Sequence, residues 1–307
     1  MKNVAGKRHP ALREARRRFP DGNRFSPGHR CWLVGLLIAL GCILQGFSAT
    51  AAETASDDLT TALLNNGEDI TNPVNQAQVR LQAKTLPDAT EDHRTYTNVN
   101  SETVTLRSDW VLFSKPDQLA LRIDVPWVWS NKPGSTNKYG STQSDVGDML
   151  MQAVYVRTFD SRWAAAAGAQ FIIPTASNDA CGAGKWQIAP TVGVRASLPE
   201  ISAGSFLGVA LRQFISVAGD GNTSRSNVAY TSIQPNLNIA LPDQWFLNSN
   251  PNIKCSSSTG KWFVPLDLMV GKKFGVHWIV SVECQYRLIA GYPQYNEWIE
   301  ARLGYFF

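Results

Sequence analysis

The chain has 307 residues, with 29 basic and 25 acidic side chains and a formal charge of +4. Residues 1–51 hold nine of the basic residues and two of the acidic ones, so the other 256 residues carry a net charge of −3. The basic character therefore belongs to the N-terminal segment, and we expect no nucleic-acid partner. The three cysteines after residue 51 form no C-x-x-C pair, only two histidines accompany them, and no phosphate-binding glycine loop is present, so the sequence predicts no metal site and no cofactor.

Residues 1–51 have the three parts of a cleaved secretory signal peptide. A basic stretch reaches to about residue 30, an apolar run extends from Cys31 to Phe47, and small residues follow. Ala49-Thr50-Ala51 fits the A-x-A rule, so we place cleavage after Ala51 or one residue later. The alternatives are a twin-arginine signal at Arg16-Arg17, a lipoprotein acylated at Cys42 and a retained membrane anchor.

Residues 52–73 show no strand pattern. Leu59, Leu63 and Leu64 have helical spacing, and Ser56 with Asp57 is a possible helix cap. The segment is predicted to be a plug that enters a barrel from below or, equally, a flexible periplasmic tail.

Twelve strands are predicted between residues 74 and 307, each bounded by turn residues. Their ranges are roughly 74–85, 100–113, 118–130, 147–158, 162–174, 186–197, 205–218, 227–240, 244–253, 261–271, 276–290 and 296–307. Apolar and polar residues alternate along most of them, as Ile233, Leu237 and Ile239 do against Ser232 and Asn236. The connections after even strands are mostly short, and those after odd strands are generally longer and polar.

These features predict an all-β fold, a transmembrane antiparallel up-and-down β-barrel with short periplasmic turns and longer outer loops. The last strand alternates up to a terminal Phe307, which is the signal that outer-membrane assembly machinery typically reads. Tryptophans near the strand ends suit an interfacial belt. These are Trp127, Trp129, Trp163, Trp186, Trp245, Trp262 and Trp278. A secreted β-sandwich also alternates and is the competing fold.

Charged residues recur on the polar face at mid-strand, and we assign them to the lumen. The basic residues are Arg80, Lys84, Arg107, Arg122, Arg195, Arg212, Arg287 and Arg302. The acidic residues are Asp109, Asp124, Asp267, Glu283 and Glu300. Paired charges that simply fill the lumen are one interpretation. A filter for substrates with a carboxylate or phenolate group is the other.

Three motifs resemble the family of outer-membrane proteins named for the meta-pathway of phenol degradation. They are Asn72-Pro73, the segment Gly147-Asp148-Met149-Leu150-Met151-Gln152, and the segment from Gly182-Ala183-Gly184-Lys185-Trp186 to Thr191. The resemblance covers residues 70–307. It implies an outer-membrane channel for hydrophobic or aromatic compounds and supplies no catalytic residues. Cys181 interrupts the glycine-rich approach to Trp186 and departs from the family pattern.

The predicted function is thus an outer-membrane transporter of a Gram-negative bacterium, porin-like, that passes small hydrophobic or aromatic compounds through a charged lumen. Its expected partners are outer-membrane lipid, the barrel assembly machinery and those solutes. A structural or plugged barrel without transport is the alternative. A lipid-acting hydrolase is the third candidate, because His277 and Ser281 share one face of a predicted strand, although we expect no enzyme.

Two cysteines are predicted to form a disulfide. Cys181 and Cys255 both fall in predicted outer loops, and each precedes a Gly-Lys-Trp sequence. An exported chain passes through an oxidising compartment. The third cysteine, Cys284, is expected on the lipid-facing side as a free thiol.

Overall fold

The computed structural model describes residues 65–91, 93–219 and 225–307. The predictions for the signal peptide, for Cys42 and for a helix near Leu59 fall outside these ranges. No helix in the described ranges is long and apolar enough to cross a membrane.

Sixteen strands and one short 3-10 helix make up the described chain. The strands are β1 (Gln76–Thr85), β2 (Ala89–Glu91), β3 (Arg94–Tyr96), β4 (Asn100–Leu112), β5 (Asp117–Ser130), β6 (Gln143–Val146), β7 (Met149–Thr158), β8 (Trp163–Ile173), β9 (Lys185–Ser197), β10 (Phe206–Gly219), β11 (Ala229–Ala240), β12 (Trp245–Ser249), β13 (Ile253–Ser256), β14 (Trp262–Phe274), β15 (Trp278–Ala290) and β16 (Glu297–Phe306). The 3-10 helix η1 (Pro242–Gln244) lies between β11 and β12.

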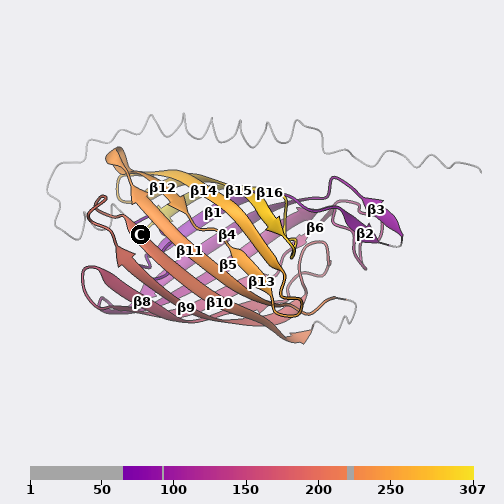
Figure 1. Ribbon diagram of the computed structural model, residues 1–307, viewed down its shortest axis with the longest axis horizontal. Coiled ribbons are helices and arrows are strands. Elements are labelled where there is room, and N and C mark those ends of the chain that lie inside the picture. The colour runs from indigo at the N-terminus through magenta and orange to yellow at the C-terminus, as the bar shows by residue number, and fades with distance from the viewer. Residues whose placement is uncertain (1–64, 92, 220–224) are drawn as a thin grey trace, which may run out of the picture. The chain divides into compact units, whose positions relative to one another are not determined.

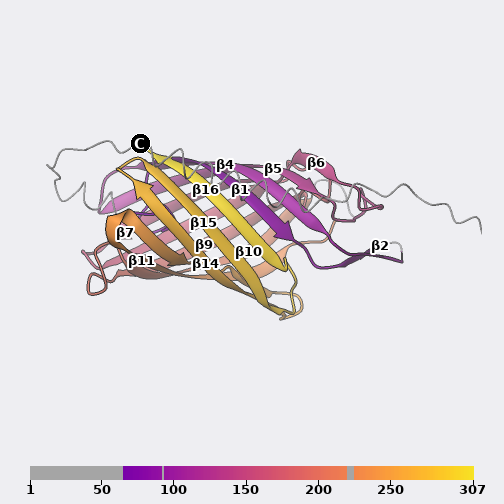
Figure 2. The ribbon, with the colours of Figure 1, turned by 90° about the horizontal axis from the view of Figure 1, so that it is seen from above.

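Fourteen of these strands form one sheet that closes on itself (Figures 1 and 2). Each strand pairs antiparallel with its neighbours, and β1 closes the ring against β16. Both β6 and β7 pair with β5, and both β12 and β13 lie between β11 and β14, so each of these couples acts as one interrupted strand. The barrel therefore has the twelve strands that the sequence predicts.

The two interruptions correct the predicted strand boundaries. The fourth predicted strand, 147–158, is extended by β6, and the break falls at Gly147, where an added Cβ would lie 2.9 Å from Val128 Cγ2. The ninth, 244–253, breaks around Pro251, which has no backbone N–H for the ladder, and resumes as β13. The β2–β3 hairpin, within the first long loop, was not predicted.

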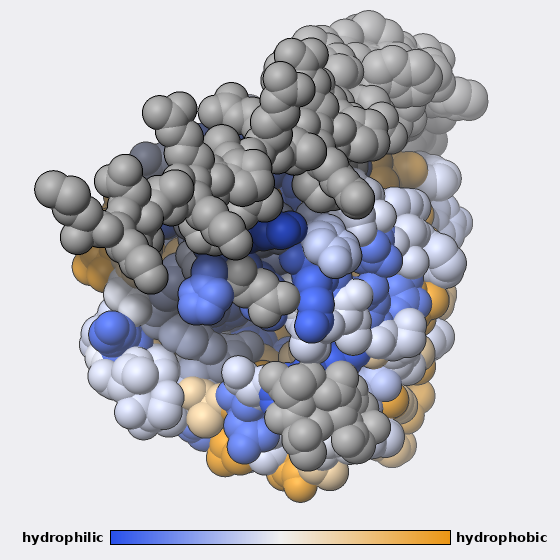
Figure 3. Space-filling model, turned by 90° about the vertical axis from the view of Figure 1, so that its right-hand side faces the viewer, coloured by the Kyte–Doolittle hydropathy of each residue, from blue (hydrophilic) through white to orange (hydrophobic). Residues whose placement is uncertain are grey.

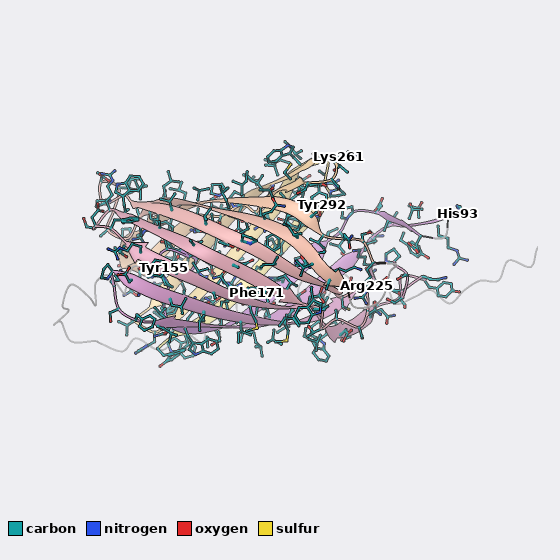
Figure 4. All side chains as sticks on the ribbon, turned by 90° about the horizontal axis from the view of Figure 1, so that it is seen from below. His93, Tyr155, Phe171, Arg225, Lys261 and Tyr292 are labelled. Carbon is teal, nitrogen blue, oxygen red and sulfur yellow. The ribbon has the colours of Figure 1, made fainter. Side chains whose placement is uncertain are left out.

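The burial pattern is the inverse of that in a water-soluble protein. On β16, Ile299 is 50% exposed whereas Arg302 is 2% exposed, and the two residues have opposite parity. Outward-facing Tyr155 and Phe171 project from the wall (Figure 4). Seen from the end with the long loops, hydrophilic side chains occupy the middle (Figure 3). An apolar outer wall around a polar lumen is the pattern of an outer-membrane barrel, and it argues against the β-sandwich.

The seven predicted belt tryptophans all face outward, with exposures between 36% and 46%. Trp298, which the alternation assigns to the polar face, points the other way and lines the lumen cavity. The predicted facing of the strands is therefore confirmed at both ends of the barrel.

The connections differ between the two ends. One end, called here the short-turn end, carries the compact connections 113–116, 159–162, 198–205, 241–244 and 275–277, together with the C-terminus (Figure 1). The other, the long-loop end, carries the β2–β3 hairpin, β6 and the longer connections, of which 174–184 and 131–142 are the largest that are described throughout. His93 lies at the tip of that hairpin (Figure 4).

Gly168 allows a close approach between neighbouring strands, and replacing it tests the barrel. An added Cβ would overlap the backbone carbonyl oxygen of Ala153. Gly168→Val should therefore lower the free energy of unfolding by about 1–3 kcal/mol, and with it the fraction of the protein that folds. Heat-modifiable migration of the refolded protein in detergent gels measures the folded fraction. Ala167→Val is the matched control, because Ala167 is outward-facing and exposed. Equal folding of the two variants would contradict the close approach that the structure shows at Gly168.

Candidate functional site

The lumen contains the segment just before β1. Asn66 Nδ2 donates a 2.8 Å hydrogen bond to Asn238 Oδ1 on β11, and Asp69 forms a 2.9 Å ion pair with Arg195 on β9. Ile70 packs against Val154, Val156 and Ala166 on β7 and β8. Residues 66–70 therefore touch several sides of the inner wall, which requires them to lie inside the barrel.

The segment also has an apolar anchor nearer β1. Val74 packs against a buried cluster made by inward-facing residues of β12, β14, β15 and β16. The cluster consists of Phe246, Met269, Ile279 and Phe306. Because these positions lie near the short turns, this end of the lumen is filled by apolar side chains.

Glu68 is the main counter-charge that the segment brings to the wall. Arg80 and Arg302 are cross-strand partners on β1 and β16, and both guanidinium groups form ion pairs with Glu68 Oε1. Burial alone would raise the pKa of Glu68, but the positive charges of Arg80 and Arg302 outweigh it and lower this pKa below its ordinary value. Glu68 is therefore ionised, and it relieves the repulsion between two like charges.

A second group of charges lies on β4 and β5. Arg107 and Asp124 are cross-strand partners joined by two hydrogen bonds of 2.8 and 2.7 Å, and Arg122 reaches Asp109 at 2.5 Å. Gln76 Nε2 also donates to Asp109 at 2.7 Å. Bidentate pairs of this kind fix guanidinium and carboxylate groups in place. These four predicted lumen residues are brought together and satisfy one another.

Acidic side chains gather on β14, β15 and β16. Glu283 and Glu300 are cross-strand partners, and Asp267 lies on the inward face of β14. Glu300 Oε1 accepts a hydrogen bond from Arg80 at 3.1 Å, and Asp267 Oδ1 accepts one from the backbone N–H of Asn250 at 2.6 Å. This wall therefore gathers three carboxyl groups at the lumen, of which Glu300 is paired with Arg80.

The remaining predicted lumen residues are more separate. Lys84 Nζ lies 5.2 Å from the ring centroid of Trp298. Arg287 is half-buried near the long-loop end of β15, opposite Pro265 on β14. It forms no ion pair with the described residues. Arg212 is buried on β10 and also has no carboxylate partner in the described part of the chain. The structure thus brings together most, but not all, of the predicted charges.

A cavity of about 430 Å³ remains inside the barrel. It is bordered by Glu68 and Asp69 from the segment and by side chains from almost every wall strand. Arginines and glutamines contribute much of its lining, namely Arg80, Arg107, Arg122, Arg212, Gln82, Gln170, Gln187, Gln234 and Gln285. A polar, charged space of this size suits a small solute.

The sequence prediction missed Glu68 and Asp69 as site residues. The signal that pointed to them was the imbalance of eight bases against five acids on the predicted wall. Buried positive charge requires compensation, and the two acids just before the first strand were the nearest unassigned candidates in sequence. Lys185, Lys254 and Lys273 also have inward parity and were missed.

The features of a hydrolase do not converge. His277 Nδ1 is 2.7 Å from the backbone oxygen of Phe306, whereas Ser281 Oγ accepts from Arg302 Nε at 2.9 Å. His93 is exposed at the hairpin tip. No group of three or more His, Cys, Asp and Glu residues suited to a metal ion occurs in the described ranges.

The predicted disulfide between Cys181 and Cys255 is absent from the structure, and this prediction is corrected. Cys181, Cys255 and Cys284 are all free cysteines in the structure. Cys255 lies in β13, paired with Trp262 and Thr231, and not in a loop, while Cys181 is buried with its Sγ 3.7 Å from the Val128 carbonyl oxygen. The strand extension past Pro251 removes the loop position that the prediction required.

The two longer sequence motifs meet at the long-loop end. The Asp148 side chain accepts hydrogen bonds from the backbone N–H groups of Gly184 at 3.0 Å and Ala176 at 3.2 Å. At Gly182 an added Cβ would lie 2.7 Å from Asp148 Oδ1, so glycine is required there. The aspartate of the first motif therefore orders the glycine-rich loop of the second.

The family comparison agrees with these motifs. The family model described as "Putative MetA-pathway of phenol degradation" matches residues 87–247, more than half of the chain. The chain belongs to this family. No curated protein sequence matches it.

The chain is also similar to solved structures of outer-membrane proteins. An outer membrane channel from Pseudomonas putida F1 has a TM-score of 0.59 and 14% identity, over 83% of this chain and 100% of that one. The KdgM porin solved with disordered oligogalacturonate has a TM-score of 0.46 and 13% identity, over 76% of this chain and 99% of that one. Outer membrane phospholipase A from Escherichia coli has a TM-score of 0.43 and 10% identity, over 81% of this chain and 96% of that one. The first similarity shows the fold of an outer-membrane barrel; the other two are too weak to support an argument.

Glu68→Gln tests whether the ion pairs of the segment 66–70 stabilise the barrel. Loss of the shared carboxylate leaves Arg302 without a carboxylate partner and leaves Arg80 with Glu300 alone, so the stability should fall by about 3 kcal/mol at neutral pH. Denaturant unfolding in detergent, followed by tryptophan fluorescence, measures it. Because the pKa of Glu68 is lowered from 4.5, the difference from wild type should be complete above about pH 4.5 and decline only as the pH falls further.

Arg162→Gln is the control for Glu68→Gln. Arg162 pairs with Glu200 at 2.9 Å, but both side chains are at least half exposed, so its loss should cost less than about 1 kcal/mol. If the two variants unfolded alike, the ion pairs of Glu68 would not hold the segment in the lumen.

Proposed function

We propose that the protein is an outer-membrane channel that passes small hydrophobic or aromatic compounds through its charged lumen. The observation that carries the proposal is the cavity of about 430 Å³ inside a closed barrel, bordered by fixed charges of both signs. Charged rings in a pore select solutes by their charge, and apolar outer walls hold the pore in lipid. The name of the family, which refers to phenol degradation, supports an aromatic solute.

The balance of lumen charges favours anionic solutes. Eight predicted bases face five predicted acids on the wall, and Glu68 and Asp69 raise the acids to seven. The inward-facing Lys254 adds a further basic group. A compound with a carboxylate or phenolate group would therefore enter a lumen of complementary charge.

The same proposal covers location and assembly. A signal peptide of residues 1–51 would take the chain through the inner membrane of a Gram-negative bacterium. Phe307 would then be read by the barrel assembly machinery, and the outward-facing aromatic and aliphatic residues would contact outer-membrane lipid.

A barrel that does not transport is the second candidate. The observation in its favour is the segment 66–70, which lies across the lumen and is held by ion pairs to Arg80, Arg195 and Arg302. Conductance of the purified protein in planar bilayers separates the two functions. A channel gives discrete current steps and admits aromatic acids, whereas a plugged barrel gives none.

The fixed positive charge should control ion selectivity. Replacing Arg122, Arg212 and Arg287, all three by glutamine, removes three positive charges from the lumen. The reversal potential in a salt gradient should then shift to values that indicate a greater preference for cations. Arg157→Gln is the control, since Arg157 is exposed on the outer face, paired with Asp117. An unchanged reversal potential in the triple variant would mean that these arginines do not act on permeating ions.

A further inference from the structure

Arg212 differs from the other buried arginines of the lumen wall. Its side chain is buried, with 6% of the residue exposed, and its Nε donates to no atom of the described residues. Arg80, Arg107, Arg122, Arg195 and Arg302 each form an ion pair with an aspartate or glutamate. A buried guanidinium without a counter-charge is costly, so the surroundings of Arg212 are electrostatically incomplete.

The neighbouring strands do not supply the missing charge. The cross-strand partners of Arg212 are Thr191 on β9 and Ser232 on β11, which are neutral. Thr191 Oγ1 donates to the Ala189 carbonyl at 3.0 Å, and Ser232 Oγ donates to Asn252 Oδ1 at 2.7 Å. Both hydroxyl groups are thus oriented by other acceptors. Among the described residues neither neighbouring strand supplies an anion to Arg212, and Arg212 lines the cavity, from which an anionic ligand can reach it.

Aromatic rings lie beside this guanidinium on the same inner face. Phe214 and Tyr230 are cross-strand partners on β10 and β11, and their rings stack with centroids 4.6 Å apart and planes at 16°. Both rings line the same cavity as Arg212. Outside the cavity lining, the Tyr292 ring lies 6.1 Å from Tyr230 and Lys254 Nζ lies 4.9 Å from the Tyr230 ring centroid.

These contacts form a path from the long-loop end. Tyr292 belongs to the connection between β15 and β16 at that end (Figure 4). Tyr230 is near the start of β11, and Arg212 pairs two residues farther along that strand. An aromatic solute arriving from the long-loop end would meet Tyr292, then the Tyr230–Phe214 stack, and then the positive charge.

We propose that Arg212, Phe214 and Tyr230 form a binding site for a small aromatic carboxylate. The guanidinium would donate two charge-assisted hydrogen bonds to the carboxylate oxygens, and the two aromatic side chains would contact the ring. The cavity of about 430 Å³ has room for a single-ring ligand. This inference rests on the proposed channel function and assigns the solute class and its site within the lumen.

The combination of groups favours this ligand over simpler ones. An inorganic anion satisfies the charge of Arg212 but makes no use of the stacked rings. A neutral aromatic compound contacts the rings but leaves the guanidinium without a counter-charge. An aromatic carboxylate and a phenolate each carry a negatively charged oxygen. Of the two, only the carboxylate has a pair of oxygens that can accept both hydrogen bonds of the guanidinium fork.

Benzoate binding to the full protein purified from outer membranes tests the site. Isothermal titration in detergent should show saturable binding of benzoate, with cyclohexanecarboxylate, acetate and benzyl alcohol binding at least about tenfold more weakly. Arg212→Gln should weaken benzoate binding about tenfold or more, because a charge-assisted contact is lost. Arg212→Lys should recover part of the affinity, since it keeps the charge without the fork.

The aromatic part of the site has its own variants. Tyr230→Leu and Phe214→Leu should reduce the preference for benzoate over acetate, whereas Tyr230→Phe should keep it, because it retains the ring. Arg157→Gln, on the outer face, should bind benzoate as wild type does. Heat-modifiable migration of each variant shows that it is folded before binding is compared.

Several results would overturn the proposal. Wild-type affinity for benzoate in folded Arg212→Gln would remove the arginine from the site. An unchanged preference in folded Tyr230→Leu and Phe214→Leu would remove the rings. Absence of saturable benzoate binding in wild type would reject the site altogether.

Bilayer currents distinguish this failure from failure of the channel itself. If the wild-type protein conducts chloride but benzoate neither binds nor reduces the current, the site is wrong and the channel function stands. If benzoate binds in the titration but the protein conducts no ions, the binding site stands and the transport function fails.

Discussion

Compensation of buried charge is the constraint on which the rest of this structure depends. The outer wall is apolar, so the inward-facing positions carry nearly all the polar groups of the strands. An arginine in such a narrow interior loses much of its hydration and needs a carboxylate or another acceptor within hydrogen-bond distance. Neighbouring strands meet this need on β4 and β5, where Arg107 faces Asp124 and Asp109 faces Arg122.

Where the strands do not meet it, the chain brings a counter-charge from elsewhere. Arg80 and Arg302 are directly opposite each other, which would be destabilising without a third group. Glu68 supplies that group, and Asp69 does the same for Arg195. The segment before β1 therefore stabilises the wall, and in doing so it narrows the space that a solute can use.

This dual role connects stability with transport. A lumen filled entirely by matched pairs would hold itself together but would offer nothing to a solute. Arg212 is a buried exception to this matching, since neutral partners flank it and its Nε has no acceptor in the described part of the chain. The unmatched charge lies beside two stacked rings and faces the remaining cavity. The wall thus has matched charges on several strands, and beside Arg212 it is open to a ligand.

The sequence by itself determined the all-β class, the twelve strands and the facing of residues such as Trp278, Arg302 and Ile299. The physical reason is local: alternation with a period of two is imposed by the strand backbone, and turn residues mark its ends. It also determined that charged residues line the lumen, because an outer face in lipid excludes them.

Only the tertiary structure decided which charges meet. Arg122 pairs with Asp109 because of strand register, and Glu68 reaches Arg302 across 234 positions because the N-terminal segment turns into the barrel. The placement of Cys255 in β13 and the isolation of Arg212 likewise depend on register and on the path of the chain through the interior. Alternation specifies the side of the wall on which a residue lies, but the closed ring of strands sets the distances, and those distances determine pairing.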